Sequence, residues 1–196
     1  MNAAPGFAAK SMRRHAALAA ALFLAPRHVL PLDLTPRAGF REMDGIQIPI
    51  VELADGAGKI TFQPPADWKC EGGPRLLTLT PPDPGERRVE LRLDAVTETD
   101  FDLWCRERLP RLATQIALAA EAASPFTLRG LPSSENTYTY AFQSRLYTAS
   151  IACVELSPDQ RLTLVVTAPA ENFKATHEAA VRALFTFDWK ETAPAR

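Results

Sequence analysis

The sequence predicts an α+β protein in which an antiparallel sheet of about six to eight strands is flanked by two main helices. Two observations predict this class. Short alternating runs, separated by turns rich in Pro, Gly and Asp, recur between residues 46 and 168, and two other segments have the spacing of amphipathic helices. The chain has 196 residues, of which 46% are hydrophobic, so it is long enough to bury one core.

The first predicted strands form a hairpin. Residues 46–53 alternate, and Pro49 places them at a sheet edge because proline cannot donate to a neighbouring strand. The turn DGAG at 55–58 returns the chain into a second strand at 59–63.

Two further strands, 75–80 and 87–96, flank the turn PPDPGE. The second alternates clearly, which predicts one buried and one exposed face. Its apolar side carries Val89, Leu91 and Leu93, and its polar side carries Arg88, Glu90, Arg92 and Asp94.

A helix is expected after residue 99. Thr99 is a natural N-cap, with Asp102 at the third helical position as in a capping box. Pro110 falls on the polar side, so we expect it to kink the helix without ending it. The predicted apolar stripe contains Phe101, Cys105, Leu109, Leu112 and Ile116.

The second half returns to strands, predicted at 126–130, 136–143, 146–156 and 162–168. The strand at 146–156 has small or apolar residues on both faces, which indicates a central strand covered on both sides. A second helix follows Pro169 and precedes FTFDW at 185–189. Its apolar stripe contains Phe173, His177, Ala180, Val181 and Leu184.

The N-terminal segment has the layout of a secretory signal, with basic residues followed by an apolar run over 16–25. We expect a signal peptide at 1–25, read from Met1 or Met12, and a periplasmic or extracellular protein. The alternative is a cytoplasmic protein with a disordered, alanine-rich leader. The other expected segments are a Pro-rich linker (26–45), one α/β domain (46–189) and a C-terminal tail (190–196).

Composition excludes several classes of function. The formal charge of −1 without a basic stripe argues against nucleic-acid binding. The apolar run in the leader is too short to span a bilayer, so no membrane span is expected once the signal is removed. Cys70, Cys105 and Cys153 allow one disulfide at most and lack the spacing of a zinc site, and no pattern predicts a cofactor.

Some local motifs resemble those of the PsbP/DcrB-like fold family. They are Phe62, Pro65 and Trp68 after an early strand, Gly130-Leu131-Pro132 before the middle strands, and a last helix that runs into Phe187. The family includes photosystem II accessory subunits, a Ran-binding release factor, bacterial exported lipoproteins and chaperones for toxin-effector helices. The resemblance therefore implies an α/β/α sandwich and a non-enzymatic accessory protein that binds a protein partner. The chain lacks the anchoring cysteine of the lipoprotein members.

Aromatic residues are the candidate partner or ligand surface. Tyr138, Tyr140 and Phe142 share one strand face with Tyr147 across the turn, although a core cluster would give the same pattern. Trp68 is either a ligand platform or a cap on the core.

Two other functions stay open. One is a carrier of small apolar ligands, with Tyr138 and Tyr140 lining a cavity. The other is a hydrolase or thiol enzyme in which His177 acts with Cys153 or a serine, because the other two histidines lie in the leader. Cys70, expected in a loop beside Lys69, is a further candidate thiol.

Overall fold

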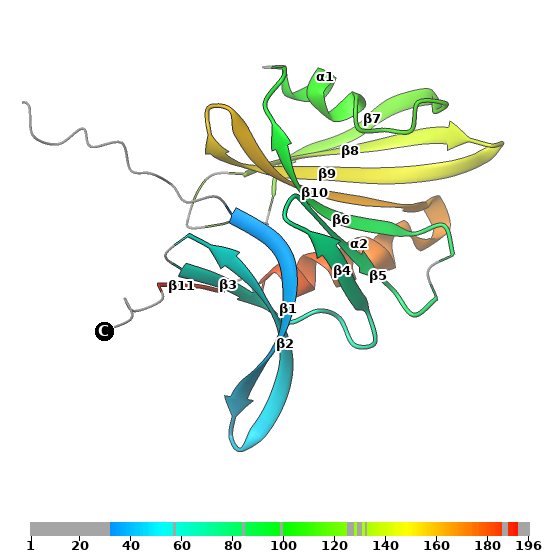
Figure 1. Ribbon diagram of the computed structural model, residues 1–196. Coiled ribbons are helices and arrows are strands. Elements are labelled where there is room, and N and C mark those ends of the chain that lie inside the picture. The colour runs from blue at the N-terminus through cyan, green and yellow to red at the C-terminus, as the bar shows by residue number, and fades with distance from the viewer. Residues whose placement is uncertain are drawn as a thin grey trace, which may run out of the picture.

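The computed structural model describes residues 32–191, except 57, 84, 99, 125–127, 129–130, 132 and 186–187. It contains two antiparallel sheets and two helices, so the predicted α+β class is confirmed. The larger sheet has seven strands, and Figure 1 shows the smaller sheet beside it. The predicted leader at 1–25 and most of the strand at 126–130 lie outside the described residues.

The large sheet has the strand order β4-β5-β6-β10-β9-β8-β7. In chain order its strands are β4 (Lys69–Gly73), β5 (Leu76–Thr80), β6 (Arg88–Ala95), β7 (Thr114–Ala123), β8 (Ser133–Phe142), β9 (Arg145–Ser157) and β10 (Gln160–Pro169). The small sheet has the order β1-β2-β3-β11 and consists of β1 (Leu32–Met43), β2 (Ile46–Asp55), β3 (Gly58–Phe62) and β11 (Asp188–Glu191).

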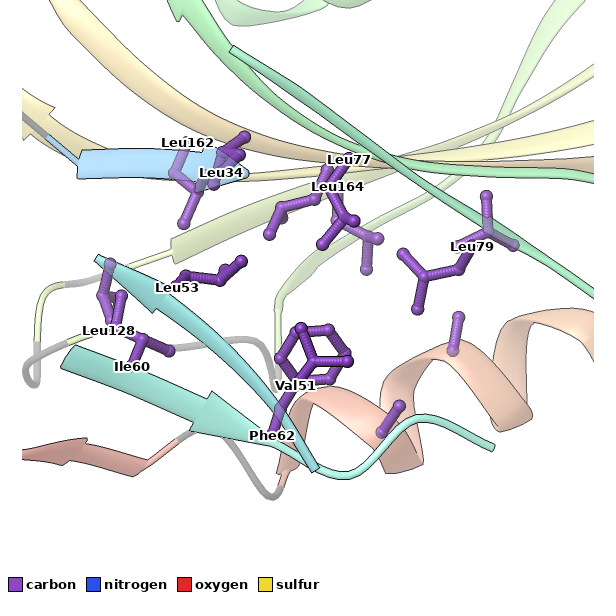
Figure 2. Close-up of a cluster of buried hydrophobic side chains, with 14 of the residues drawn as sticks. Leu34, Val51, Leu53, Ile60, Phe62, Leu77, Leu79, Leu128, Leu162 and Leu164 are labelled. Atoms are coloured by element: carbon purple, nitrogen blue, oxygen red, sulfur yellow. The ribbon is translucent and has the colours of Figure 1, made fainter. Parts of the chain in front are cut away.

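One side of the large sheet, called here the closed face, is covered by the small sheet and by α2 (Ala170–Phe185). Figure 2 shows leucines of both sheets pointing into the space between them, with Phe62 and α2 beneath. Leu77, Leu91 and Phe62 are fully buried there. This interface between the layers is the main hydrophobic core of the protein.

The other side, called here the α1 face, carries a second buried cluster under α1 (Phe101–Arg106). Alternation along each strand separates the two faces. On β9, Ala149, Ile151 and Cys153 belong to the α1 face, whereas Ala152 and Val154 belong to the closed face. The predicted central position of this strand is confirmed, because β9 lies between β10 and β8.

The first predicted helix is wrong in length. α1 ends at Arg106, and the chain enters β7 at Thr114, so Ile116 lies in a strand. The helix does not continue through Pro110, where a kink was expected, since proline cannot donate a helical hydrogen bond. The N-cap is Asp100, whose side chain accepts a hydrogen bond from the Leu103 N–H at 3.0 Å.

The predicted linker is also wrong from residue 32 onward. β1 pairs with β2 and buries Leu32 and Leu34, so the apolar residues between the prolines anchor this segment. A register shift between Asp33 and Arg37 accommodates Pro36, as bulges do. At the other end, β11 pairs with β3 and includes Lys190 and Glu191, which were assigned to the tail.

Two smaller corrections concern β2 and β4. β2 is not an edge strand, since it pairs with both β1 and β3. Pro49 is tolerated because β3 pairs with β2 only from Val51 to Asp55, beyond the proline. Cys70 lies in strand β4 rather than in a loop.

A candidate functional site: the cleft on the α1 face

α1 is held on the large sheet by one tryptophan whose ring contacts two arginines. Trp104 is fully buried, with the Arg108 guanidinium 3.3 Å from its ring centroid and the Arg161 guanidinium 4.8 Å from it. Arg108 also donates to the Trp104 carbonyl at 2.6 Å and pairs with Asp94 on β6 at 3.4 Å. These contacts fix the start of the segment after α1 over the sheet.

Asp102 is the second anchor of α1. Its carboxylate pairs with Arg106 at 2.6 Å and accepts a hydrogen bond from the Tyr138 hydroxyl at 2.8 Å. The bond from Arg106 chiefly lowers the pKa of Asp102, and the bond from Tyr138 lowers it further. Tyr138 is therefore part of the support of the helix and is itself fully buried.

Because α1 has only six residues, it covers part of the α1 face and leaves a cleft beside it. The cleft has a volume of about 560 Å³. The segment from Glu107 to Arg111 forms one wall, and β6, β8, β9 and β10 form the rest. Its lining residues are Glu86, Arg88, Glu90, Arg92, Glu107, Arg108, Leu109, Pro110, Arg111, Tyr140, Phe142, Gln143, Tyr147, Val165 and Thr167.

Three aromatic side chains form a continuous ladder in this cleft. Tyr140 and Tyr147 are directly opposite on β8 and β9, and their rings stack with centroids 5.6 Å apart. Phe142 contacts the Tyr147 ring edge-on at 6.1 Å. The Tyr147 hydroxyl donates to Glu86, and burial raises the pKa of Tyr140 to about 12, so both hydroxyls stay protonated at neutral pH.

Charged side chains of both signs surround the ladder. Glu90 is buried on β6 and is paired with Arg88 at 2.5 Å and with Arg92 at 3.8 Å. Arg145, next to the cleft, bridges Glu86 and Glu171. Arg111 is exposed and makes no ion pair with the described residues, so it is available to a partner.

The sequence-predicted surface is therefore divided. Tyr140, Phe142 and Tyr147 line the cleft, Tyr138 lies beneath α1, and Trp68 packs against the core of the closed face. Sequence reasoning missed Trp104 and Arg161. The pair Trp104 and Arg108 has the i, i+4 spacing of helical neighbours, but nothing local relates Arg161 to them.

His177 does not meet a nucleophile. Its Nε2 lies 2.9 Å from Glu135 on the closed face, and the Ser150 hydroxyl donates to the same carboxylate at 2.6 Å. The acid thus stands between serine and histidine, whereas in a catalytic triad the histidine stands between serine and acid. Cys153 belongs to the α1 face, so the predicted pair with His177 is wrong.

Glu135 has a lowered pKa despite its burial. Desolvation raises that pKa, but hydrogen bonds from His177 and Ser150 together outweigh it. The carboxylate is therefore ionised at neutral pH and holds α2 against β8 and β9.

The three cysteines are free thiols, so none forms the disulfide that the sequence allowed. Burial raises the pKa of Cys70 and of Cys153 to about 11 each and that of Cys105 to about 12. Thiols with such pKa values are protonated at neutral pH and are poor nucleophiles. Among the described residues, no group of His, Cys, Asp or Glu could hold a metal ion.

Within the described ranges, no helix is long and apolar enough to cross a membrane. Three large hydrophobic side chains, Phe40, Met43 and Ile46, are exposed at the turn end of the β1–β2 hairpin. Figure 1 shows this hairpin projecting from the body of the protein. The hairpin is a second apolar surface, separate from the cleft.

Comparisons with known proteins give structural neighbours only. No protein-family model matches the chain, and no curated protein matches it in sequence. The Ran-binding protein Mog1p of Saccharomyces cerevisiae overlaps with a TM-score of 0.45 at 12% identity, over 80% of this chain and 96% of that chain. A mutant of protein Mog1 overlaps with a TM-score of 0.41 at 12% identity, over 76% of this chain and 89% of that chain.

Protein PA94 of Pseudomonas aeruginosa, a protein of unknown function, overlaps with a TM-score of 0.39 at 13% identity, over 76% of this chain and 96% of that chain.

Proposed function

We propose that this protein is a non-enzymatic accessory domain that binds a protein partner in the cleft on the α1 face. The observation that carries the proposal is the ladder of Tyr140, Tyr147 and Phe142, which lines an open cleft beside Arg111. Tyrosine, phenylalanine and arginine are enriched in protein interfaces, where aromatic rings supply apolar area at a low entropic cost.

The charge of the cleft favours a protein over a small apolar ligand. Four arginines and three glutamates line it, and Glu90 is already paired. An apolar ligand that filled the cleft would take these groups out of water without replacing their hydrogen bonds, which is costly. A protein surface can offer complementary charges and hydrogen bonds at the rim.

The chemistry of the closed face supports a binding role over hydrolysis. Ser150 is fully buried and donates to Glu135, so its hydroxyl is not placed for attack by way of His177. The described thiols have raised pKa values. Nucleophilic catalysis needs an activated group that substrate can reach.

Export is part of the proposal. The basic residues and the apolar run before residue 26 support a cleaved signal, which would deliver the domain to the periplasm or the cell exterior. Sequencing the N-terminus of the protein purified from its native host tests this point. A shortened chain recovered outside the cytoplasm is expected, and an intact leader on a cytoplasmic protein would contradict export.

Site-specific photocrosslinking in the native host tests the binding site. In one variant a photoreactive residue replaces Gln143 at the cleft. In a second variant it replaces Lys174 on the exposed side of α2. We expect one discrete protein adduct from position 143 and none from position 174.

Two phenylalanine variants provide the matched control. Phe142→Ala should abolish the adduct at position 143, because it removes a ring from the ladder. Phe40→Ala, which removes an exposed ring on the β1–β2 hairpin, should leave the adduct unchanged. Equal adducts from both positions, or an adduct insensitive to Phe142→Ala, would contradict the proposal.

A further inference from the structure

The two edges of the large sheet are protected very differently. β4, at one edge, has five residues with Lys69 and Glu71 among them, and β1 covers it. β7, at the other edge, has ten residues, nine of them exposed, and Glu121 is its only charged residue. A long edge strand that is mostly apolar and carries a single charge is a template for pairing with another strand.

Only part of β7 is regular enough to receive a strand. Its pairing with β8 shifts between Thr114 and Ala117 and again between Leu118 and Ala120. From Ala120 to Ala123 the register is continuous. Bulges disrupt pairing in the first part of the strand, so a docked strand would pair with this last part.

An acidic hollow lies beside that regular segment. It has a volume of about 660 Å³ and lies between the start of α1 and the end of β7. Asp100, Asp102 and Glu121 line it together with Phe101. Asp102 is paired with Arg106, whereas Glu121 has no partner among the described residues, so the hollow keeps a net negative charge.

Glu121 faces this hollow from the edge itself. It lies opposite Asn136, two residues before Tyr138 on β8, and Asn136 also lines the hollow. A residue placed opposite Glu121 on an added strand would project to the same side. There a lysine or arginine would meet the carboxylates, and its stem would reach the Phe101 ring.

We propose that β7 binds an extended peptide segment of a partner protein, which adds a strand along Ala120–Ala123 and places a basic side chain in the acidic hollow. Alanines at 120, 122 and 123 leave room for larger apolar side chains on the added strand. A second copy of this chain fits less well, because β7 contains no lysine or arginine to offer. The surface is separate from the aromatic cleft, so the two proposals stand independently.

Selection from a displayed library of random ten-residue peptides against the whole protein tests this inference. We expect enriched peptides that alternate apolar residues and carry one Lys or Arg. Binding of a synthetic enriched peptide should slow amide exchange in β7. Replacing its basic residue with Gln should weaken binding about two- to five-fold, as expected for an exposed ion pair.

Charge reversal on the protein sharpens the test without disturbing the core. Glu121→Lys should weaken binding of the basic peptide at least as much as the Gln substitution in the peptide does. Glu42→Lys on the β1–β2 hairpin is a matched charge reversal at an exposed site and should leave binding unchanged. Enrichment of peptides without a basic residue, or no enrichment, would overturn the proposal. So would a dimer of the free protein that Glu121→Lys dissociates, because the second copy would then be the occupant.

Discussion

The closed face and the α1 face of the large sheet are covered to different extents. The small sheet and α2 cover the closed face over β4, β5, β6, β10 and β9, where it buries a core of leucines and Phe62. The α1 face is covered by six helical residues anchored through Trp104, and the remainder is a cleft of aromatic and charged side chains. The first face holds the fold together, and the second leaves surface available for binding.

A pair of Phe→Ala variants should show the largest difference between the faces. Phe62→Ala should lower the free energy of unfolding by about 3–5 kcal/mol, because it empties a fully buried site. Phe142→Ala should cost only about 1 kcal/mol, since the ring is half-buried and a smaller area is lost. Denaturant unfolding measures both. Equal losses of unfolding free energy in the two variants would contradict the view that the closed face stabilises the fold and the α1 face serves binding.

The sequence predicted the closed face better than the α1 face. Alternation along 87–96 correctly placed Val89, Leu91 and Leu93 in the core, since local periodicity reports burial directly. The cleft exists because α1 is short, and the apolar stripe predicted through Ile116 made the expected helix too long. Leu112 on that stripe is 77% exposed. The apolar residues after Pro110 therefore belong to a turn and an edge strand, although their spacing is that of a helix.

The pairing of Trp104 with Arg161 could not be predicted because it joins α1 to a strand far along the chain. Likewise, His177 and Cys153 lie on opposite faces of the large sheet. The alternation of β9 assigns Cys153 to one of its two faces, but only the packing of α2 shows that His177 lies on the other. Long-range contacts of this kind depend on the assembled topology.

The ionised Glu135 should make the closed face sensitive to acid. Its folded pKa lies below the ordinary value of 4.5, so its contribution to stability is present above that value and is lost as the pH falls through the lowered pKa. Glu135→Gln should cost about 1.5–3 kcal/mol at neutral pH and should reduce the loss of stability on acidification.

Thermal unfolding at several pH values checks this prediction. Glu121→Gln is the matched control, because that carboxylate has no partner among the described residues. A Glu135→Gln variant with the acid profile of the parent protein would show that the link between α2 and β8 does not depend on the charge.

A smaller effect is expected at the edge strand β4. A Cβ at Gly72 would lie 2.1 Å from the Leu76 carbonyl oxygen and 2.8 Å from the Leu77 Cα, so the backbone must shift. Gly72→Ala should cost about 1–3 kcal/mol, as overpacking does. At Gly73 a Cβ meets nothing within 4 Å, and Gly73→Ala should leave the free energy of unfolding nearly unchanged. Comparable losses in the two variants would show that β4 is not tightly packed against β5.

The most direct test of the central claim is amide exchange of the protein in complex with the partner that crosslinks at position 143. Binding should slow exchange in the segment 107–111 and at the end of β8, which border the cleft. Exchange in α2 and in the β1–β2 hairpin should stay as in the free protein. Protection confined to the hairpin with Phe40, Met43 and Ile46, and absent from the cleft, would contradict the account.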